Sequence, residues 1–272
     1  MNQKSLQDKT FSSIAWSGSI QIIAQVLNFG LSIILARLLS PTDFGLMATM
    51  LVFIGFAQLL SDFGLSTSLI QKDSVNNRDA FSCSVVNAIF GSVFTIALIV
   101  CHQQIADFYG EPSLEGIVLA VSPIFVLNSI CSVPQALLAR ELAHKKVALI
   151  GLVSLLTGSI TAVLFAINDF GVWSLILQQY VSITVKVVLL LYVSKFKWAR
   201  FDIDVIKSLF NFSANVFLTR LIQQIAQQSD KVLVGKYLGT QDLGLYSRAF
   251  HFTTFPINNI TCLLYTSPSP RD

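Results

Sequence analysis

The sequence predicts an all-α transmembrane protein, and three observations carry that prediction. Of the 272 residues, 53% are hydrophobic and only 12% are charged, whereas a soluble domain has about 25% charged residues. The mean hydropathy is +0.67 over the whole chain, so lipid rather than water is expected to cover much of the surface. The apolar residues also fall into runs of about 20 residues, enough for a helix to cross roughly 30 Å of hydrocarbon. This composition excludes most classes of soluble enzyme.

Seven complete apolar runs and part of an eighth are separated by short polar segments. Turn-forming pairs such as Ser40-Pro41 and Asn168-Asp169 bound them. The first run is too long for a signal peptide and has no small-residue cleavage site, so we interpret it as a retained helix. The predicted spans are approximately residues 11–36, 44–70, 80–101, 114–138, 147–168, 171–194, 208–235 and 243–264.

Lys and Arg are distributed unevenly between the loops. Alternate loops, starting with the amino-terminal segment, hold eleven of these residues, whereas the intervening loops hold only Arg37 and Lys236. Because basic residues of short loops stay on the cytoplasmic side, we expect a cytoplasmic amino terminus. The net charge of +3 is therefore interpreted as a sign of membrane orientation. No interleaving of basic and aromatic residues supports a nucleic-acid partner.

One segment of the chain recurs 199 residues later. Residues 36–46 align with residues 235–245, and the predicted helices before them carry polar residues at matching positions. The spacing of four, three and four places each polar set on one helix face. Six spans separate the copies, so both cross the membrane in the same direction, as parallel repeats. The matched sets are Gln21, Gln25, Asn28 and Ser32 in the first copy, and Arg220, Gln224, Gln227 and Lys231 in the second.

Parallel repeats predict two bundles of six helices, of which this chain contains the first and the opening of the second. Residues 1–194 are expected to form the amino-terminal lobe and residues 195–207 a cytoplasmic connector. Residues 208–262 then begin the carboxy-terminal lobe. Residues 263–272 resemble translated sequencing-adapter sequence, so they are left out of the expected fold and a truncated gene product is expected.

Charged residues within the predicted spans need an explanation, because each costs about 2.5–3.5 kcal/mol on insertion scales. We expect Lys186, Arg220 and Lys231 to line a water-filled cavity, where they attract an anionic group of a substrate. Alternatively, Lys186 and Arg220 pair with a carboxylate such as Asp62 or cap a helix. Lys231 could instead pair with the adjacent Asp230. Asp62 itself is a candidate for ion coupling or for a structural contact.

Amide side chains recur on the helices that precede both repeated segments. They are Gln21, Gln25 and Asn28 in the first copy, and Gln224 and Gln227 in the second. Amides offer both donors and acceptors, which suits sugar hydroxyls, so we expect these residues to line the same cavity. The alternative is that they join membrane helices through interhelical hydrogen bonds.

No catalytic or nucleotide-binding motif is present. The histidines are scattered without H-E-x-x-H spacing, and no P-loop run occurs. The cysteines lack the spacing of metal ligands and are expected to be buried, inert thiols. We therefore expect neither an enzyme nor a bound cofactor or metal. The cysteines are Cys83, Cys101, Cys131 and Cys262.

An ordered set of motifs runs through residues 10–260. It begins with Leu-Ala-Arg-Leu-Leu-Ser-Pro-Thr-Asp-Phe-Gly-Leu at residues 35–46. This set resembles polysaccharide exporters of the Wzx and colanic-acid type, within the multidrug/oligosaccharidyl-lipid/polysaccharide (MOP) superfamily. The further motifs are Ser61–Ser66, Ile105–Tyr109, Gly171–Leu175, Ser229–Gly235 and Leu243–Ala249.

The resemblance implies a MOP/MATE-like helical bundle with two six-helix lobes around a central cavity, working by alternating access. It implies an undecaprenyl-pyrophosphate-linked oligosaccharide as substrate, a unit of O-antigen, capsule or exopolysaccharide, flipped across the bacterial inner membrane. Membrane lipids, and a glycan polymerase or glycosyltransferases, would be the other partners. Basic cavity residues are this family's usual way of holding a pyrophosphate, and Arg220 and Lys186 fit that role. The departure is the length, which is about half of what the family needs.

Two other functions remain open from the sequence. A cation-coupled multidrug antiporter of the same superfamily would need buried carboxylates, yet Asp62 and Asp230 both lie near the ends of spans. A non-transporting membrane scaffold for polysaccharide assembly would pack Gln21, Gln25 and Arg220 against other helices and leave no cavity.

Overall fold

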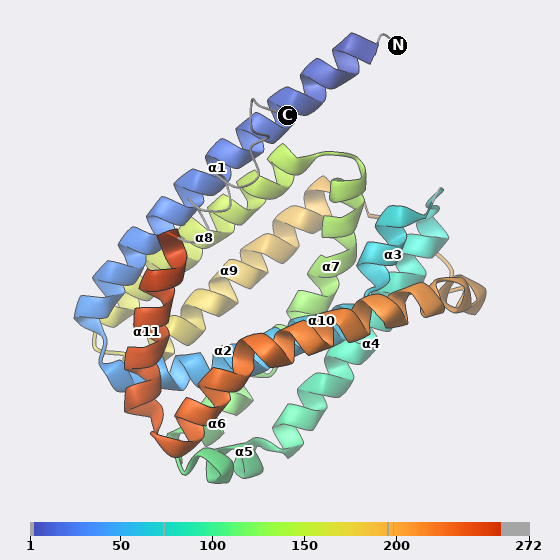
Figure 1. Cartoon of the computed structure of the whole chain (residues 1–272). Helices are drawn as coiled ribbons and strands as arrows, with labels where there is room; N and C mark the ends of the chain where they lie inside the picture. Colours follow the sequence, from blue (N-terminus) through green and yellow to red (C-terminus); the bar gives the residue numbers. More distant parts are fainter. Residues whose placement is uncertain (1–2, 73, 195, 198, 257–272) are drawn as a thin grey trace, which may run out of the picture.

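The computed structural model describes residues 3–72, 74–194, 196–197 and 199–256, and helices form almost all of this part of the chain (Figure 1). The end of the predicted eighth span, Cys262 and residues 263–272 lie outside the described residues. The helices are α1 (Gln3–Leu38), α2 (Pro41–Asp62), α3 (Leu65–Gln71), α4 (Asn77–Val100), α5 (His102–Tyr109), α6 (Ser113–Val121), α7 (Ile124–Arg140), α8 (His144–Ile167), α9 (Val172–Val193), α10 (Ile203–Tyr237) and α11 (Thr240–Pro256).

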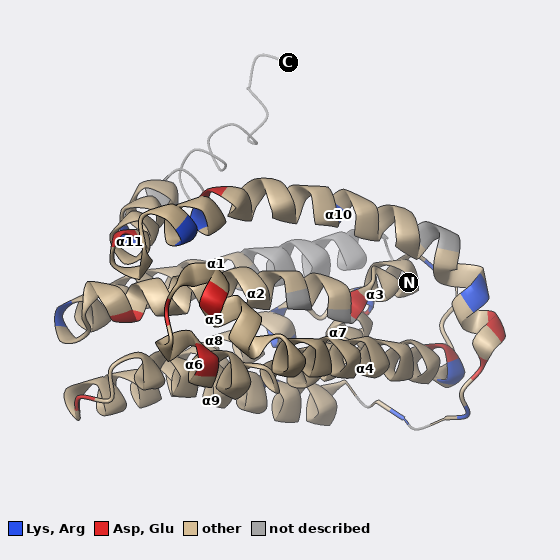
Figure 2. Cartoon of the chain, turned by 90° about the horizontal axis from the view of Figure 1, so that it is seen from below, with Lys and Arg blue, Asp and Glu red and all other residues tan. Residues whose placement is uncertain are grey.

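Within the described ranges, six helical segments are long and apolar enough to cross a membrane, and they correspond to the first six predicted spans. Large apolar side chains are exposed on their outer faces, including Val93 and Ile96 of α4 and Ile160 and Leu164 of α8. Figure 2 shows the charged residues mostly at helix ends and in the connections. The all-α membrane bundle is therefore confirmed. The segments are Gly18–Leu38, Pro41–Leu60, Asn77–Val100, Ser113–Arg140, His144–Ile167 and Val172–Val193.

Two of the predicted spans are interrupted. The second ends at Phe63 and Gly64, which have φ angles of 41° and 73° in the left-handed region. Gly64 lies against α10, where a Cβ would be only 2.7 Å from the backbone oxygen of Ser213, so the turn into α3 lets the two backbones approach closely. The fourth span divides into α6 and α7 around Ser122 and Pro123. Pro123 has no backbone N–H and so cannot donate a helix hydrogen bond.

The seventh predicted span, residues 208–235, lies within the single long helix α10, but it is not among the six apolar segments. Its length is sufficient, whereas its amides and charged residues lower its hydropathy. Leu209 near its start belongs to a buried cluster with Leu69 of α3, Cys83 of α4 and Val133 of α7. This end of α10 is therefore anchored on the first six spans.

The first turns of α2 and α11 pack against each other in a reciprocal contact. A Cβ at Gly45 would collide with the backbone oxygen of Thr240, and a Cβ at Gly244 would collide with that of Pro41. Both pairs of positions, 41 with 240 and 45 with 244, are 199 residues apart. The two copies of the repeated segment thus meet through equivalent backbone positions, where only glycine leaves enough room.

The start of α2 is fixed by local sequence. Ser40 Oγ accepts a hydrogen bond from the Asp43 backbone N–H at 3.2 Å, and Asp43 Oδ2 accepts one from the Ser40 backbone N–H at 3.0 Å. Pro41 occupies the first turn, where the absence of its N–H costs nothing. This capping box sets the point at which α2 enters the bundle.

The cysteines differ in exposure. Cys83 and Cys131 are buried, as predicted, but Cys101 is exposed. The prediction was wrong for Cys101 because this residue lies at the junction of α4 and α5, beyond the end of the packed span.

Candidate functional site

One face of α2 borders two hollows that are candidates for a binding site. Phe44, Ala48, Leu51, Gly55 and Asp62 recur at intervals of three, four or seven residues, so they lie along the same side of the helix. The first three border a hollow against α1, α9 and α11, and Gly55 borders a second hollow against α10. At a rise of 1.5 Å per residue, Ala48 and Gly55 are about 10 Å apart along the axis.

The α2–α10 hollow has a volume of about 310 Å³ and is mostly polar. Arg220, Gln224 and Gln227, three of the residues predicted for a substrate cavity, line it together. Gly55 of α2 makes room for this group, because a Cβ there would collide with Gln224 Nε2. The complete lining is Gly55, Gln58, Leu59, Arg220, Gln223, Gln224 and Gln227.

Arg220 is also paired with a carboxylate, which is the alternative that the sequence left open. Its Nη1 lies 3.3 Å from Asp62 Oδ2, and its Nη2 donates to Thr67 Oγ1 at 2.8 Å. Asp62 is held in turn, because its Oδ1 accepts hydrogen bonds from the Ser66 backbone N–H at 3.1 Å and from Asn87 Nδ2 at 3.4 Å. The pair joins α10 to the end of α2. With its side chain 45% exposed, Arg220 still faces the hollow.

Gln224 supplies a donor without a partner. Its Nε2 is buried and makes no hydrogen bond to the described residues. A buried amide nitrogen left in this way is costly, about 1–3 kcal/mol. The α2–α10 hollow is therefore lined by a cation and by an amide whose buried nitrogen, packed against Gly55, has no partner among the described residues.

The α1–α11 hollow has a volume of about 230 Å³ and lies between α1, α2, α9 and α11. Asn28 and Ser32 of the predicted polar stripe line it, whereas Gln21 and Gln25 of the same stripe line neither hollow. The stripes on α1 and α10 thus border separate hollows along α2. They do not face each other across one space.

The two remaining predicted cations lie outside both hollows. Lys186 is partly buried on α9, within electrostatic range of Cys131 on α7. The Lys231 ammonium donates to Gln228 Oε1 at 2.9 Å. Asp230 instead accepts the Lys231 backbone N–H at 2.8 Å and the Tyr246 hydroxyl at 2.6 Å. The ion pairs of the described residues do not include one between Asp230 and Lys231.

Sequence reasoning missed five polar residues of the α1–α11 hollow. The same signal that selected Arg220, a polar or charged residue inside an apolar run, was present for all of them. They lie outside the matched positions of the 199-residue repeat, which marks only the helices before the repeated segments. The missed residues are Gln178 and Gln179 of α9, and Ser247, Arg248 and His251 of α11.

Comparison with known proteins places the sequence of this chain in a protein family. The model of a family described as "Polysaccharide biosynthesis protein" matches residues 34–266, most of the chain. The chain belongs to this family. The match includes the reciprocal contact between α2 and α11 and all residues that line the α2–α10 hollow.

Relatives of this chain are similar to it over most of its length. It is 28% identical over 249 residues to the succinoglycan biosynthesis transport protein ExoT of Rhizobium meliloti, covering 90% of this chain and 50% of ExoT. It is 26% identical over 255 residues to the lipopolysaccharide biosynthesis protein WzxC of Escherichia coli, covering 93% of this chain and 52% of WzxC. The teichuronic acid biosynthesis protein TuaB of Bacillus subtilis is 25% identical, with 88% and 49% covered. The chain spans about half the length of these curated relatives, and no solved structure matches it.

Proposed function

We propose that the chain is the amino-terminal part of a transporter that moves an undecaprenyl-pyrophosphate-linked oligosaccharide across the bacterial inner membrane by alternating access. Its amino terminus would lie in the cytoplasm, on the side where glycosyltransferases supply the substrate. Membership of the polysaccharide biosynthesis family supports this proposal, as does similarity to a relative named as a transport protein.

The observation that carries the proposal is the polar α2–α10 hollow, whose two helices we assign to the first and the second lobe. Arg220 offers a guanidinium group, which can bind phosphate oxygens through two parallel hydrogen bonds. Gln224 and Gln227 add amides able to donate to phosphate or exchange hydrogen bonds with hydroxyls. This chemistry matches the junction between a pyrophosphate and its first sugar.

Asp62 then has a positioning role. It neutralises Arg220 and holds the guanidinium at the wall of the hollow, with Asp62 Oδ2 3.3 Å from Arg220 Nη1. A pyrophosphate would compete with this carboxylate for the same guanidinium. Lys186 lines neither hollow in the present arrangement. It would therefore act as a second cation for the substrate only after the lobes have moved.

The competing functions fit the hollows less well. An antiporter for cationic drugs needs carboxylates, but neither described hollow has Asp or Glu in its lining. A scaffold without transport would pack Gln21, Gln25 and Arg220 against other helices and leave no cavity. Gln21 and Gln25 line neither hollow, but Arg220 shares a polar hollow with Gln224 and Gln227.

The test is complementation in a bacterial strain that lacks its own flippase, using the complete protein that contains this chain. Surface glycan is quantified by immunoblot, and protein levels in the membrane are matched. The wild type should restore surface glycan, whereas Arg220→Ala and Lys186→Ala should each lower it about ten-fold or more. Lys207→Ala, which removes an exposed cation of the same helix α10, should export normally. If both Arg220→Ala and Lys186→Ala export at the wild-type level, the proposal is wrong.

A further inference from the structure

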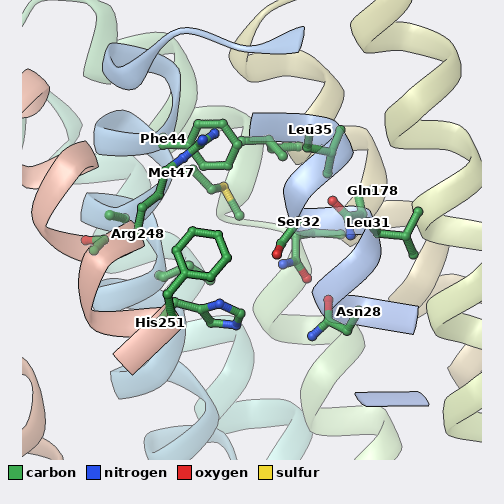
Figure 3. Close-up of a pocket in the computed structure, with 15 residues that line it drawn as sticks. Asn28, Leu31, Ser32, Leu35, Phe44, Met47, Gln178, Arg248 and His251 are labelled. Carbon is green, nitrogen blue, oxygen red and sulfur yellow. The ribbon is translucent and has the colours of Figure 1, made fainter. Parts of the chain in front are cut away.

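The α1–α11 hollow differs from the α2–α10 hollow in its chemistry. Figure 3 shows Arg248 and His251 on one side of the hollow and Asn28, Ser32 and Gln178 on the other. The walls therefore combine amides, two hydroxyls and an imidazole with a single guanidinium. Apolar side chains, among them the rings of Phe44 and Phe252, complete the lining.

Two polar atoms of the α11 wall have no partner. Arg248 Nη2 and Ser247 Oγ are both buried and make no hydrogen bond to the described residues. The guanidinium of Arg248 lies 3.2 Å from the centroid of the Phe44 ring, a cation–π contact that fixes one face of the group. Both atoms are shielded from solvent, so an oxygen-bearing ligand would supply the missing acceptor once the Arg248 side chain turns toward the hollow.

The size and charge of the hollow restrict the ligand. Its volume of about 230 Å³ is below the roughly 300–1,000 Å³ of pockets that hold drug-sized molecules, so one ring fits better than an oligosaccharide. A pyrophosphate carries several negative charges, whereas this lining contains one cation that is already stacked on Phe44. Neutral amides and aromatic walls are suited to a ring with hydroxyls on its edge and C–H groups on its face.

We propose that the α1–α11 hollow is a subsite for one hexose ring. Arg248, Ser247 and the amides of Gln178 and Asn28 bind its hydroxyls, and Phe252 covers an apolar face of the ring. The subsite rests on the proposed function, since it receives a sugar of the oligosaccharide whose pyrophosphate lies at Arg220. Both hollows open on the same face of α2, about 10 Å apart along the helix axis, so one extended substrate can reach both.

The experiment measures sugar binding directly by saturation-transfer difference NMR. The chain is purified in lipid nanodiscs and titrated with methyl glucoside, methyl galactoside, methyl mannoside and methyl glucuronide. We expect transfer to at least one hexoside, with at least ten-fold weaker binding in Gln178→Leu and in Arg248→Gln. Lys207→Gln, which removes an exposed cation of α10, should bind the same hexoside as the wild type. Circular dichroism and size-exclusion chromatography establish that each variant is folded.

The possible outcomes separate the subsite from the transport function. If no hexoside shows transfer from the wild-type chain, the subsite is wrong, whatever the export measurement gives. Binding that survives in the folded variants Gln178→Leu and Arg248→Gln places the sugar elsewhere and also overturns it. Hexoside binding lost in these two variants supports the subsite even if Arg220→Ala exports normally, a result that would refute only the pyrophosphate assignment.

Discussion

The reciprocal contact between the first turns of α2 and α11 predicts that Gly45→Ala destabilises the chain. A new Cβ would collide with the backbone oxygen of Thr240, and no side-chain rotation can relieve a collision with backbone. Overpacking of this kind costs about 1–3 kcal/mol. The matched control is Gly151→Ala in α8, where a Cβ meets nothing within 4 Å. There the exchange should stabilise the helix by about 1 kcal/mol.

The two variants should therefore differ by about 2–4 kcal/mol, because the effects have opposite signs. At roughly 2–4 °C per kcal/mol for a chain of this size, the apparent Tm values should differ by about 4–16 °C. Thermal unfolding in detergent, followed by circular dichroism, measures this difference. Gly244→Ala should behave like Gly45→Ala, and the double variant should lose less than the sum, since the first substitution already opens the shared contact. Equal Tm values for Gly45→Ala and Gly151→Ala would refute the reasoning.

Two further predictions concern the ion pair and the orientation. Asp62→Asn keeps an acceptor for the Ser66 N–H but removes the carboxylate that pairs with Arg220. The binding of inorganic pyrophosphate, titrated by calorimetry, should therefore tighten several-fold. The free energy of unfolding should change by at most about 1 kcal/mol, because Arg220 is partly exposed, and weaker pyrophosphate binding would contradict the assigned competition. With a cytoplasmic amino terminus, the exposed Cys101 faces outward, so a membrane-impermeant maleimide should label it in intact spheroplasts while sparing the buried Cys131. Labelling of Cys101 only after lysis would reverse the orientation.

Much of the fold follows from local sequence. The apolar runs correctly predicted six spans. An unpaired backbone group in lipid is costly, and a helix pairs its backbone groups within one segment, so a long apolar run is expected to be helical. The interruption at Phe63-Gly64 was not predicted, since a hydropathy average is insensitive to one residue in a left-handed conformation. The close approach of Gly64 to Ser213 is a tertiary contact, and no local pattern encodes it.

The candidate site could be predicted only in part. Three residues of the polar stripe of α10, Arg220, Gln224 and Gln227, line one hollow, because helical periodicity fixes which residues share a face. The fourth, Lys231, lies outside it. Whether the α1 stripe would face that of α10 depended on how the helices pack. In the structure the two stripes border separate hollows, and α2 lies beside both. Arg248 and Gln178 come from helices far apart in the sequence, so their meeting in one hollow required the three-dimensional structure.

The most direct test of the central claim is the affinity of the complete protein, in nanodiscs, for undecaprenyl pyrophosphate. Arg220→Gln should weaken binding about ten-fold or more, since a hydrogen bond to a charged group contributes about 1.5–3 kcal/mol and 1.4 kcal/mol corresponds to ten-fold. Lys207→Gln, which removes an exposed cation of the same helix, should bind like the wild type. Equal affinity of Arg220→Gln, Lys207→Gln and the wild type would contradict the assignment of the α2–α10 hollow to the pyrophosphate.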